Sequence, residues 1–181
     1  MDQYTRTWKM KDLIPNIDVF IELANANCPE KLTLTDSEML TLFTALWNNY
    51  SNCSVAFDTK QDFYRKFYNI LWDEADYYID KLKKYREIRA LTNDQLIKEY
   101  TNISNVANNN NKVVESPLTE IIPYITTQAT STSTSNILGA ISRAVKEYKN
   151  NELKYFLNKF NNLFLDLYGG YVVHYSLGEV D

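Results

Sequence analysis

Residues 58–90 read DTKQDFYRKFYNILWDEADYYIDKLKKYREIRA and contain no proline. Their apolar and aromatic side chains recur at the intervals of one helix face. These positions are Phe63, Phe67, Ile70, Leu71, Tyr78, Leu82 and Tyr85. Acidic residues gather in the first half and basic residues in the last turns, which suits the helix dipole. The segment therefore predicts one long amphipathic helix, with Asp62–Lys66 and Asp80–Lys84 spaced as i,i+4 ion pairs.

Shorter helices are predicted before this segment. Thr35 and Glu38 have the spacing of a capping box, in which each side chain satisfies a free backbone N–H, and they predict a helix over residues 36–49. Asn16 is a candidate N-cap for a short helix that Pro29 ends.

Two further helices are predicted behind the first long helix. Thr92 and Gln95 form another capping box, so a helix restarts there after a bend. A second long helix follows, which Ser135 or Asn136 can cap and which stops at Gly169–Gly170. Its apolar face consists of Ile141, Val145, Tyr148, Phe156, Phe160, Leu163, Phe164 and Leu167. We expect the two long helices to pack against each other.

The chain changes character in residues 101–135, which are rich in Asn, Ser and Thr. Between Thr101 and Ser142 the only charged residues are Lys112, Glu115 and Glu120. The Asn run at 108–111 signals a turn, and Pro117 and Pro123 break an α-helix. We expect a polar, extended, hairpin-like insertion here. The alternative is a flexible linker, which would not need the apolar residues Val113, Val114, Ile121, Ile122 and Ile125.

Composition limits the classes of function. The chain has 181 residues, 45% of them hydrophobic, and a net charge of −4, so it can form a core but has no overall positive charge for holding nucleic acid. No apolar run approaches the roughly 20 residues of a membrane span, so we expect no membrane contact. The start of the chain lacks the apolar core of a signal peptide. Cys28 and Cys53 are expected to be reduced thiols within the packing, and a disulfide between them is the less favoured alternative.

The sequence offers little for catalysis. His174 is the only histidine and has no evident partner, so it is more readily interpreted as a packing or surface residue than as a general base. Asp73, Asp76 and Asp80 share a helix face near Glu74, where a magnesium site is conceivable, but a solvated helix surface is the simpler interpretation. The many tyrosines of the long helix suit core and subunit contacts better than base stacking. We expect no enzyme activity, no catalytic residue, no metal and no cofactor.

The order of these parts resembles the lower collar, or head–tail connector, proteins of small short-tailed bacteriophages. A tyrosine-rich helix (YRKFYNILWDEADYYIDKLKKYREIRA) leads into a neutral excursion with a proline-containing turn (ESPLTEIIPYITTQATSTSTSN). A second long helix follows and ends in LKYFLNKFNNLFLDLYGG. The resemblance covers roughly residues 36 to 170 and is one of architecture rather than of a specific motif.

The resemblance implies a ring of about twelve subunits beneath the portal, whose helices form the wall and whose polar excursions form a tube for the genome. It implies contacts with the portal protein, with tail knob or tail appendage proteins, and transiently with double-stranded DNA. It places the protein at the head–tail junction of the virion, after assembly in the host cytoplasm. The implied tube-lining residues are Asn102, Ser104, Asn105, Thr126, Thr127, Gln128, Thr130, Ser131, Thr132 and Ser133.

A neutral lumen suits such a tube. Each phosphate that a protein neutralises strengthens binding by counterion release, so a basic lumen would slow moving DNA. Extended segments from neighbouring subunits could pair and close into a barrel, which removes exposed strand edges.

The sequence thus predicts a mainly α-helical protein with a β insertion that forms one stave of an oligomeric tube. Its expected parts are a helical connector domain (1–100 and 136–170), a polar β-tube insertion (101–135) and a C-terminal docking tail (171–181). In the tail, Tyr171, Val172, Val173 and Tyr175 are candidates for docking onto the portal or a neighbouring subunit. The alternatives are a cytoplasmic helical adaptor or regulatory protein that binds a single protein partner, and a nucleic-acid-processing protein that uses the acidic cluster.

Overall fold

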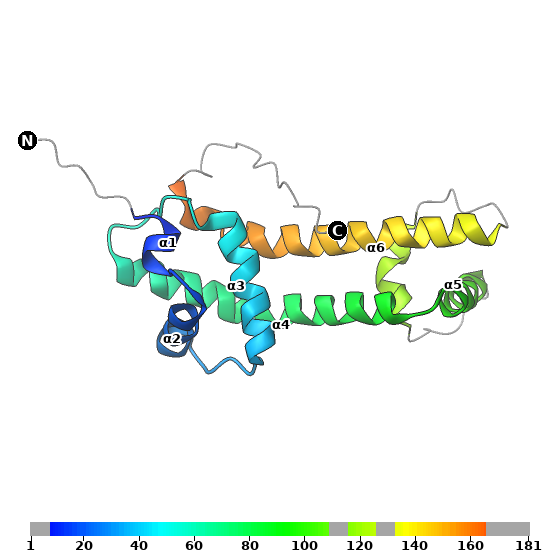
Figure 1. Cartoon of the computed structure of the whole chain (residues 1–181), viewed down its shortest axis with the longest axis horizontal. Coiled ribbons are helices and arrows are strands. Elements are labelled where there is room, and N and C mark those ends of the chain that lie inside the picture. The colour runs from blue at the N-terminus through cyan, green and yellow to red at the C-terminus, as the bar shows by residue number, and fades with distance from the viewer. Residues whose placement is uncertain (1–7, 109–115, 126–132, 166–181) are drawn as a thin grey trace, which may run out of the picture. The chain divides into compact units, whose positions relative to one another are not determined.

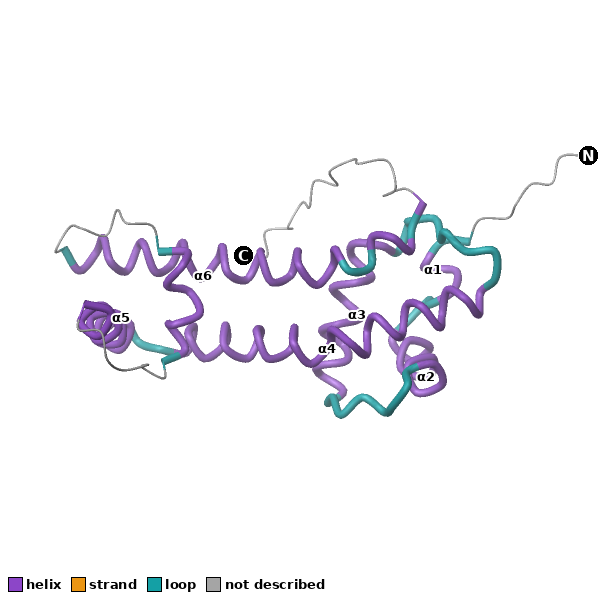
Figure 2. The backbone as a smooth tube through the Cα atoms, turned by 180° about the vertical axis from the view of Figure 1, so that it is seen from behind, coloured by secondary structure: helices purple, strands orange, loops and turns teal. Residues whose placement is uncertain are grey.

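A computed structural model of the protein describes residues 8–108, 116–125 and 133–165. For residues 105–108 it describes the helical backbone but not the side chains. The described chain is mainly helical, and it contains no strand, only the isolated bridges Lys9–Ser54 and Val55–Phe164 (Figure 2). It divides into two compact units. Unit 1 comprises Met1–Asp76 and Tyr155–Asp181, and unit 2 comprises Tyr77–Lys154.

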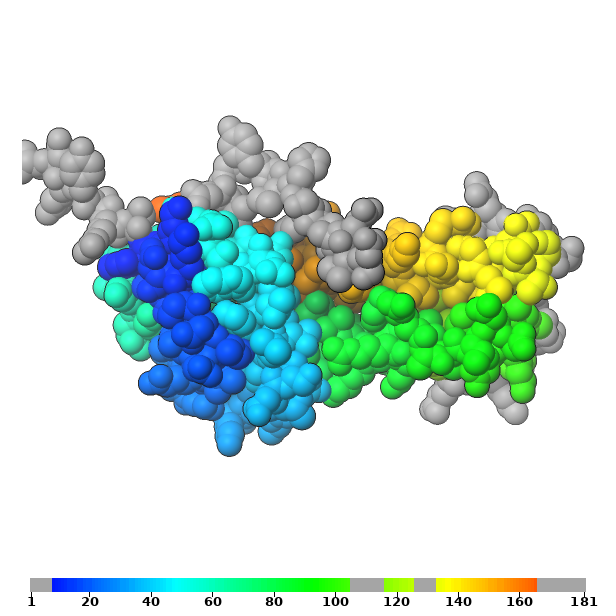
Figure 3. Space-filling model, in the orientation of Figure 1, coloured from blue at the N-terminus to red at the C-terminus, as the bar shows by residue number. Residues whose placement is uncertain are grey.

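Three short helices precede the long ones. They are α1 (Met10–Leu13), α2 (Ile17–Asn27) and α3 (Asp36–Tyr50). The predicted caps are confirmed: the Asn16 side chain accepts a hydrogen bond from Val19 N at 3.0 Å, and Thr35 and Glu38 form the capping box. In Figure 3, α1, α2 and α3 cover one side of unit 1 with a continuous surface.

The two long helices are also confirmed. They are α4 (Lys60–Ala90) and α6 (Thr134–Asn158), and each belongs partly to unit 1 and partly to unit 2. The prediction for the second helix was too long, because α6 ends at Asn158 and not near Gly169. Phe160, Leu163 and Phe164 instead follow in a 3-10 turn, η3 (Asn161–Leu163), that remains in the core of unit 1.

Aromatic rings fill the core of unit 1. Phe67 packs against Phe160 with ring centroids 5.1 Å apart, and Tyr50 stacks on Phe164 at 4.7 Å. The Tyr50 hydroxyl donates to Leu157 O at 2.6 Å and also lies 2.8 Å from Asn161 Oδ1. The end of α6 and η3 are therefore held to α3 by both stacking and hydrogen bonds.

Unit 2 contains the C-terminal part of α4, helix α5 (Asn93–Asn108), the 3-10 helix η1 (Pro117–Tyr124) and most of α6. Within this unit α4 and α6 lie side by side (Figure 1), and their contact confirms the predicted packing of the long helices there. The buried cluster consists of Ile88, Leu118, Ile121, Ile141, Ala144, Val145 and Tyr148.

The extended insertion predicted for residues 101–135 is wrong for residues 101–108 and 117–124, which are helical. Residues 101–108 complete α5, which starts at the confirmed Thr92–Gln95 capping box. Leu96, Tyr100 and Ile103 have helical spacing and pack on the core of unit 2. Two of these three residues precede Thr101, so residues 101–135 taken alone do not show the helical spacing.

Residues 117–124 are helical as well. Pro117 occupies the first helical turn, where its missing N–H costs nothing, and Ser116 Oγ accepts from Leu118 N at 3.3 Å. Leu118, Ile121 and Tyr124 recur every third residue and so share one face of a 3-10 helix, which has three residues per turn. The two prolines that exclude an α-helix are compatible with this tighter one.

Candidate functional site

The structure describes only some of the residues predicted to line a tube. Asn102, Ser104 and Asn105 lie in the last turns of α5, where Asn102 is exposed and Ser104 half-buried, so the strand expected for them is wrong. Ser133 directly precedes α6, and its hydroxyl accepts from Asn136 N at 3.4 Å. The predicted positions within 126–132 and the predicted tail residues Tyr171, Val172, Val173 and Tyr175 lie outside the described residues, as does His174.

The predicted polar excursion, residues 101–135, is attached to unit 2 by η1, which lies near the middle of the excursion. The side chains of Leu118 and Ile121 are fully buried between α4 and α6. Burial of each such side chain is worth about 1.5–3 kcal/mol relative to exposure. The excursion is therefore divided into two polar segments, residues 109–115 and 126–132, and every end of these segments belongs to the same helical unit.

A carboxylate between two lysines reinforces this attachment. Glu120 of η1 accepts from Lys81 Nζ at 2.7 Å through Oε2 and from Lys84 Nζ at 2.6 Å through Oε1. Both lysines come from successive turns of α4, and we call the three residues the Glu120 clamp. The side chains of Lys81 and Glu120 are only 18% and 29% exposed, so their attraction is screened less than that of a surface pair.

The clamp shifts the pKa values of Glu120 and Lys81. The hydrogen bonds from Lys81 and Lys84 lower the pKa of Glu120 below its ordinary value of 4.5. Burial opposes the charge of Lys81, but the hydrogen bond and charge of Glu120 outweigh it and raise the pKa of this lysine. Glu120 and Lys81 thus each favour the charged form of the other.

A buried hydroxyl lies in the same unit. Tyr148 of α6 is 1% exposed, and its hydroxyl has no hydrogen-bond partner among the described residues. Burial raises its pKa, and the charge of Glu120 raises it further. The Tyr148 ring packs edge-on against Tyr124 of η1 with centroids 6.0 Å apart. The ring therefore contributes packing to the η1 attachment, while the hydroxyl contributes no described bond.

Unit 2 also carries a surface groove of about 350 Å³ between the end of α4, the start of α5 and α6. Its floor includes the apolar side chains of Ile88, Leu96, Ile141 and Val145, and its edges include Arg89 and Lys146. We call it the α4–α6 groove. A concave apolar surface with a few charged groups at its edge is the usual form of a binding site.

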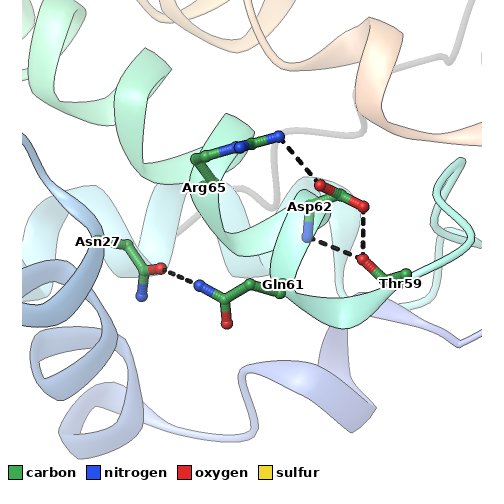
Figure 4. A network of polar contacts seen from close by, with 5 residues as sticks. All are labelled: Asn27, Thr59, Gln61, Asp62 and Arg65. Atoms are coloured by element: carbon green, nitrogen blue, oxygen red, sulfur yellow. Dashed lines mark hydrogen bonds and ion pairs between the residues drawn. The ribbon is translucent and has the colours of Figure 1, made fainter.

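A polar network in unit 1 has a structural explanation. Thr59 and Asp62 cap the start of α4, since Asp62 N donates to Thr59 Oγ1 at 3.1 Å and the Thr59 hydroxyl donates to Asp62 at 2.6 Å. Asp62 also pairs with Arg65, and Gln61 donates to Asn27 of α2 (Figure 4). The predicted Asp62–Lys66 pair is replaced by Asp62–Arg65, one position closer. These contacts position α4 and α2 and leave no evident reactive group.

Two members of the predicted acidic cluster of α4 form ion pairs with different lysines. Glu74 pairs with Lys159 at 2.8 Å in unit 1, and Asp80 pairs with Lys83 at 3.8 Å in unit 2. The predicted Asp80–Lys84 pair is wrong, because Lys84 reaches Glu120 instead. Within the described ranges, no group of three His, Cys, Asp or Glu side chains is close enough to hold a metal ion.

The two cysteines are free thiols, as expected. Each is half-buried and donates to a backbone carbonyl, Cys28 to Tyr68 at 3.5 Å and Cys53 to Asn49 at 3.7 Å. Burial raises the pKa of Cys28 to about 11. Since the thiolate is the reactive form, Cys28 is a poor nucleophile at neutral pH.

The Glu120 clamp and the groove were not predicted from the sequence. One signal was present. Glu120 is a rare charge in a neutral region and stands close to the apolar residues Leu118 and Ile121, so packing of this segment indicates a charged partner for Glu120. No helix of the described chain is both long and apolar enough to cross a membrane. Comparisons with protein-family models, with curated proteins and with solved structures find no match.

Proposed function

We propose that the protein is a structural subunit of a head–tail connector ring, the lower collar of a small short-tailed bacteriophage. In this role it joins the portal to the tail and forms a channel for DNA during ejection. The observation that carries the proposal is the attachment of the neutral excursion to one helical unit through η1. A linker between domains would not need two fully buried apolar side chains and a double ion pair at its centre.

The attachment supports a channel role for the two polar segments. The segments 109–115 and 126–132 start and end at residues of unit 2, so a ring of these units would present both from every subunit. Residues 126–132, TTQATST, carry no charge. A wall of hydroxyl and amide groups offers DNA weak, exchangeable hydrogen bonds without the counterion release that holds DNA to basic proteins.

The ring, the portal, the tail knob or appendages and the virion location are parts of the same proposal. Fewer residues are now proposed to line the channel, because Asn102, Ser104 and Asn105 belong to helix α5. We place the lining in residues 126–132 together with Ser133, and the proposed pairing of neighbouring excursions as barrel staves concerns these residues and 109–115. Asn102, Ser104 and Asn105 would lie on a helix at the base of the channel.

The test is the mass of the full-length protein in solution, alone and mixed with purified portal rings of a small short-tailed phage. We expect a ring of about twelve subunits, either alone or on the portal. Light scattering measures the mass, and electron microscopy of the mixture shows whether the portal carries a second ring.

A monomer or dimer that ignores the portal contradicts the proposal. That result favours the second candidate, a helical adaptor that binds a single protein partner, for which the α4–α6 groove is a suitable surface. A pull-down with Ser142→Glu, which places a charge at the groove, then shows whether partner binding depends on this surface, with Ser37→Glu on α3 as the matched control.

A further inference from the structure

The α4–α6 groove carries positive charge without acidic partners. Arg89 and Lys146 line it, and Lys149 lies beside it, with its Nζ atom 5.4 Å from the centroid of the Tyr85 ring. Arg89 lies over the same ring at 6.0 Å and approaches the Tyr85 hydroxyl at 3.4 Å. None of these three cations forms an ion pair with a described residue.

The apolar floor and the positive edge together indicate which kind of ligand the groove can bind. The apolar floor favours aliphatic or aromatic side chains, because burying them removes apolar surface from water. The positive edge favours carboxylates, which gain most from cations that have no carboxylate partner of their own. A groove of about 350 Å³ accommodates a few side chains of an extended peptide and not a folded domain.

One segment of the chain matches this description. Residues 171–181 read YVVHYSLGEVD, in which an apolar stretch is followed by two acidic residues, Glu179 and Asp181. The apolar residues are Tyr171, Val172, Val173, Tyr175 and Leu177. We propose that residues 171–181 of one copy dock into the α4–α6 groove of a neighbouring copy, with the apolar stretch on the floor and the acidic residues at the edge.

This inference rests on the proposed ring, because the neighbouring copy is the adjacent subunit. Each subunit would then give its tail to one neighbour and receive the tail of the other. Such a head-to-tail contact closes when the rotation between copies completes a ring.

Cysteine cross-linking in the full-length chain tests the docking. Two differently tagged versions are made in a Cys28→Ser/Cys53→Ser background, one with Ser142→Cys in the groove and one with Tyr175→Cys in the tail. They are mixed, their mass is measured before oxidation, and the disulfide product is then quantified. We expect a disulfide between the two tags. Circular dichroism checks that the background is folded; if it is not, a photo-crosslinking amino acid at position 175 of the otherwise unchanged chain gives the same readout.

Charge reversal tests the groove edge. Lys146→Glu is expected to lower the cross-linked fraction by about threefold to fivefold, because it replaces attraction of the acidic tail by repulsion. Lys154→Glu makes the same charge change at an exposed position further along α6 and outside the groove, and is expected to leave the yield nearly unchanged.

The outcomes separate this inference from the proposed function. Rings of the expected mass that give no disulfide between copies overturn the docking and leave the connector in place. Equal losses for Lys146→Glu and Lys154→Glu also overturn it. Chains that do not associate before oxidation, with or without portal rings, contradict the ring and the docking together.

Discussion

Lys84 and Glu120 are 36 positions apart in the sequence, yet Lys84 Nζ and Glu120 Oε1 are 2.6 Å apart in unit 2. Lys81 completes the contact from the preceding turn of α4. The Glu120 clamp thus joins the centre of a neutral excursion to a charged helix. We expect its removal to weaken the attachment of η1 without changing the helices that flank it.

Glu120→Gln tests the clamp energetically. The variant leaves two lysines without their carboxylate, one of them largely buried, so we expect the free energy of unfolding to fall by about 1–2 kcal/mol. Urea unfolding at pH 7 measures it. Asp80→Asn is the matched control, because the Asp80–Lys83 pair is long and exposed, and its loss is expected to cost less than about 0.5 kcal/mol. Equal effects would show that the clamp is an ordinary surface pair.

The stabilising effect of Glu120 depends on pH. The pKa of Glu120 is lowered in the folded protein relative to its ordinary value of 4.5, so its stabilisation is fully present above pH 4.5 and is lost as the pH falls through the folded pKa. The difference in unfolding free energy between the natural chain and Glu120→Gln should therefore be constant between pH 6 and 7 and shrink below pH 4.5. Urea unfolding at a series of pH values measures this difference. A difference that grows as the pH falls would contradict the assigned shift.

Tyr148→Phe removes a hydroxyl that has no described partner. We expect unchanged stability or a gain of up to about 1 kcal/mol, because an unsatisfied buried hydroxyl costs free energy. Tyr50→Phe is the contrasting variant, since the Tyr50 hydroxyl has two close oxygen partners, and it should lose about 1–2 kcal/mol. Thermal and urea unfolding compare the pair. A clear loss for Tyr148→Phe would mean that its hydroxyl is satisfied.

Ile121→Ala opens a cavity under η1. Ile121 is fully buried in the core of unit 2, so the unfolding free energy should fall by about 2–4 kcal/mol. Leu40→Ala on α3 is the control, because Leu40 is 51% exposed and its truncation should cost much less. Limited proteolysis adds a local readout: cleavage near residues 116–125 should accelerate in Ile121→Ala and stay unchanged in Leu40→Ala.

Thr127→Lys with Thr130→Lys tests the neutral lining. If these positions face the DNA channel, the added charges bind phosphates and slow ejection, with an effect that weakens as salt concentration rises. The rate of DNA release from assembled virions measures it. Lysine at the exposed Thr44 of α3 controls for added charge. Equal release rates for all variants, in virions of normal yield, would place residues 126–132 away from the channel.

Local signals in the sequence predicted much of the helical framework. Both capping boxes, Thr35–Glu38 and Thr92–Gln95, are present, because their partners lie three residues apart and meet whenever a helix starts between them. The long helix over residues 60–90 follows from a repeated apolar face that needs no distant partner to be recognised. The prediction of extended chain failed in α5 and η1 because a proline-containing, Asn-rich composition was given more weight than the spacing of Leu96, Tyr100 and Ile103.

The partners of individual side chains depended on tertiary structure. Sequence spacing assigned Lys84 to Asp80, one turn away on the same helix, but a solvated i,i+4 pair contributes only a few tenths of a kcal/mol. When the apolar face of η1 packs between α4 and α6, it brings Glu120 to Lys84 in a less exposed setting, where two hydrogen bonds to one carboxylate outweigh that weak pair. The helices could thus be predicted from contacts within a few residues. The clamp and the groove could not, because each is formed by residues from different helices that only the packing of apolar faces brings together.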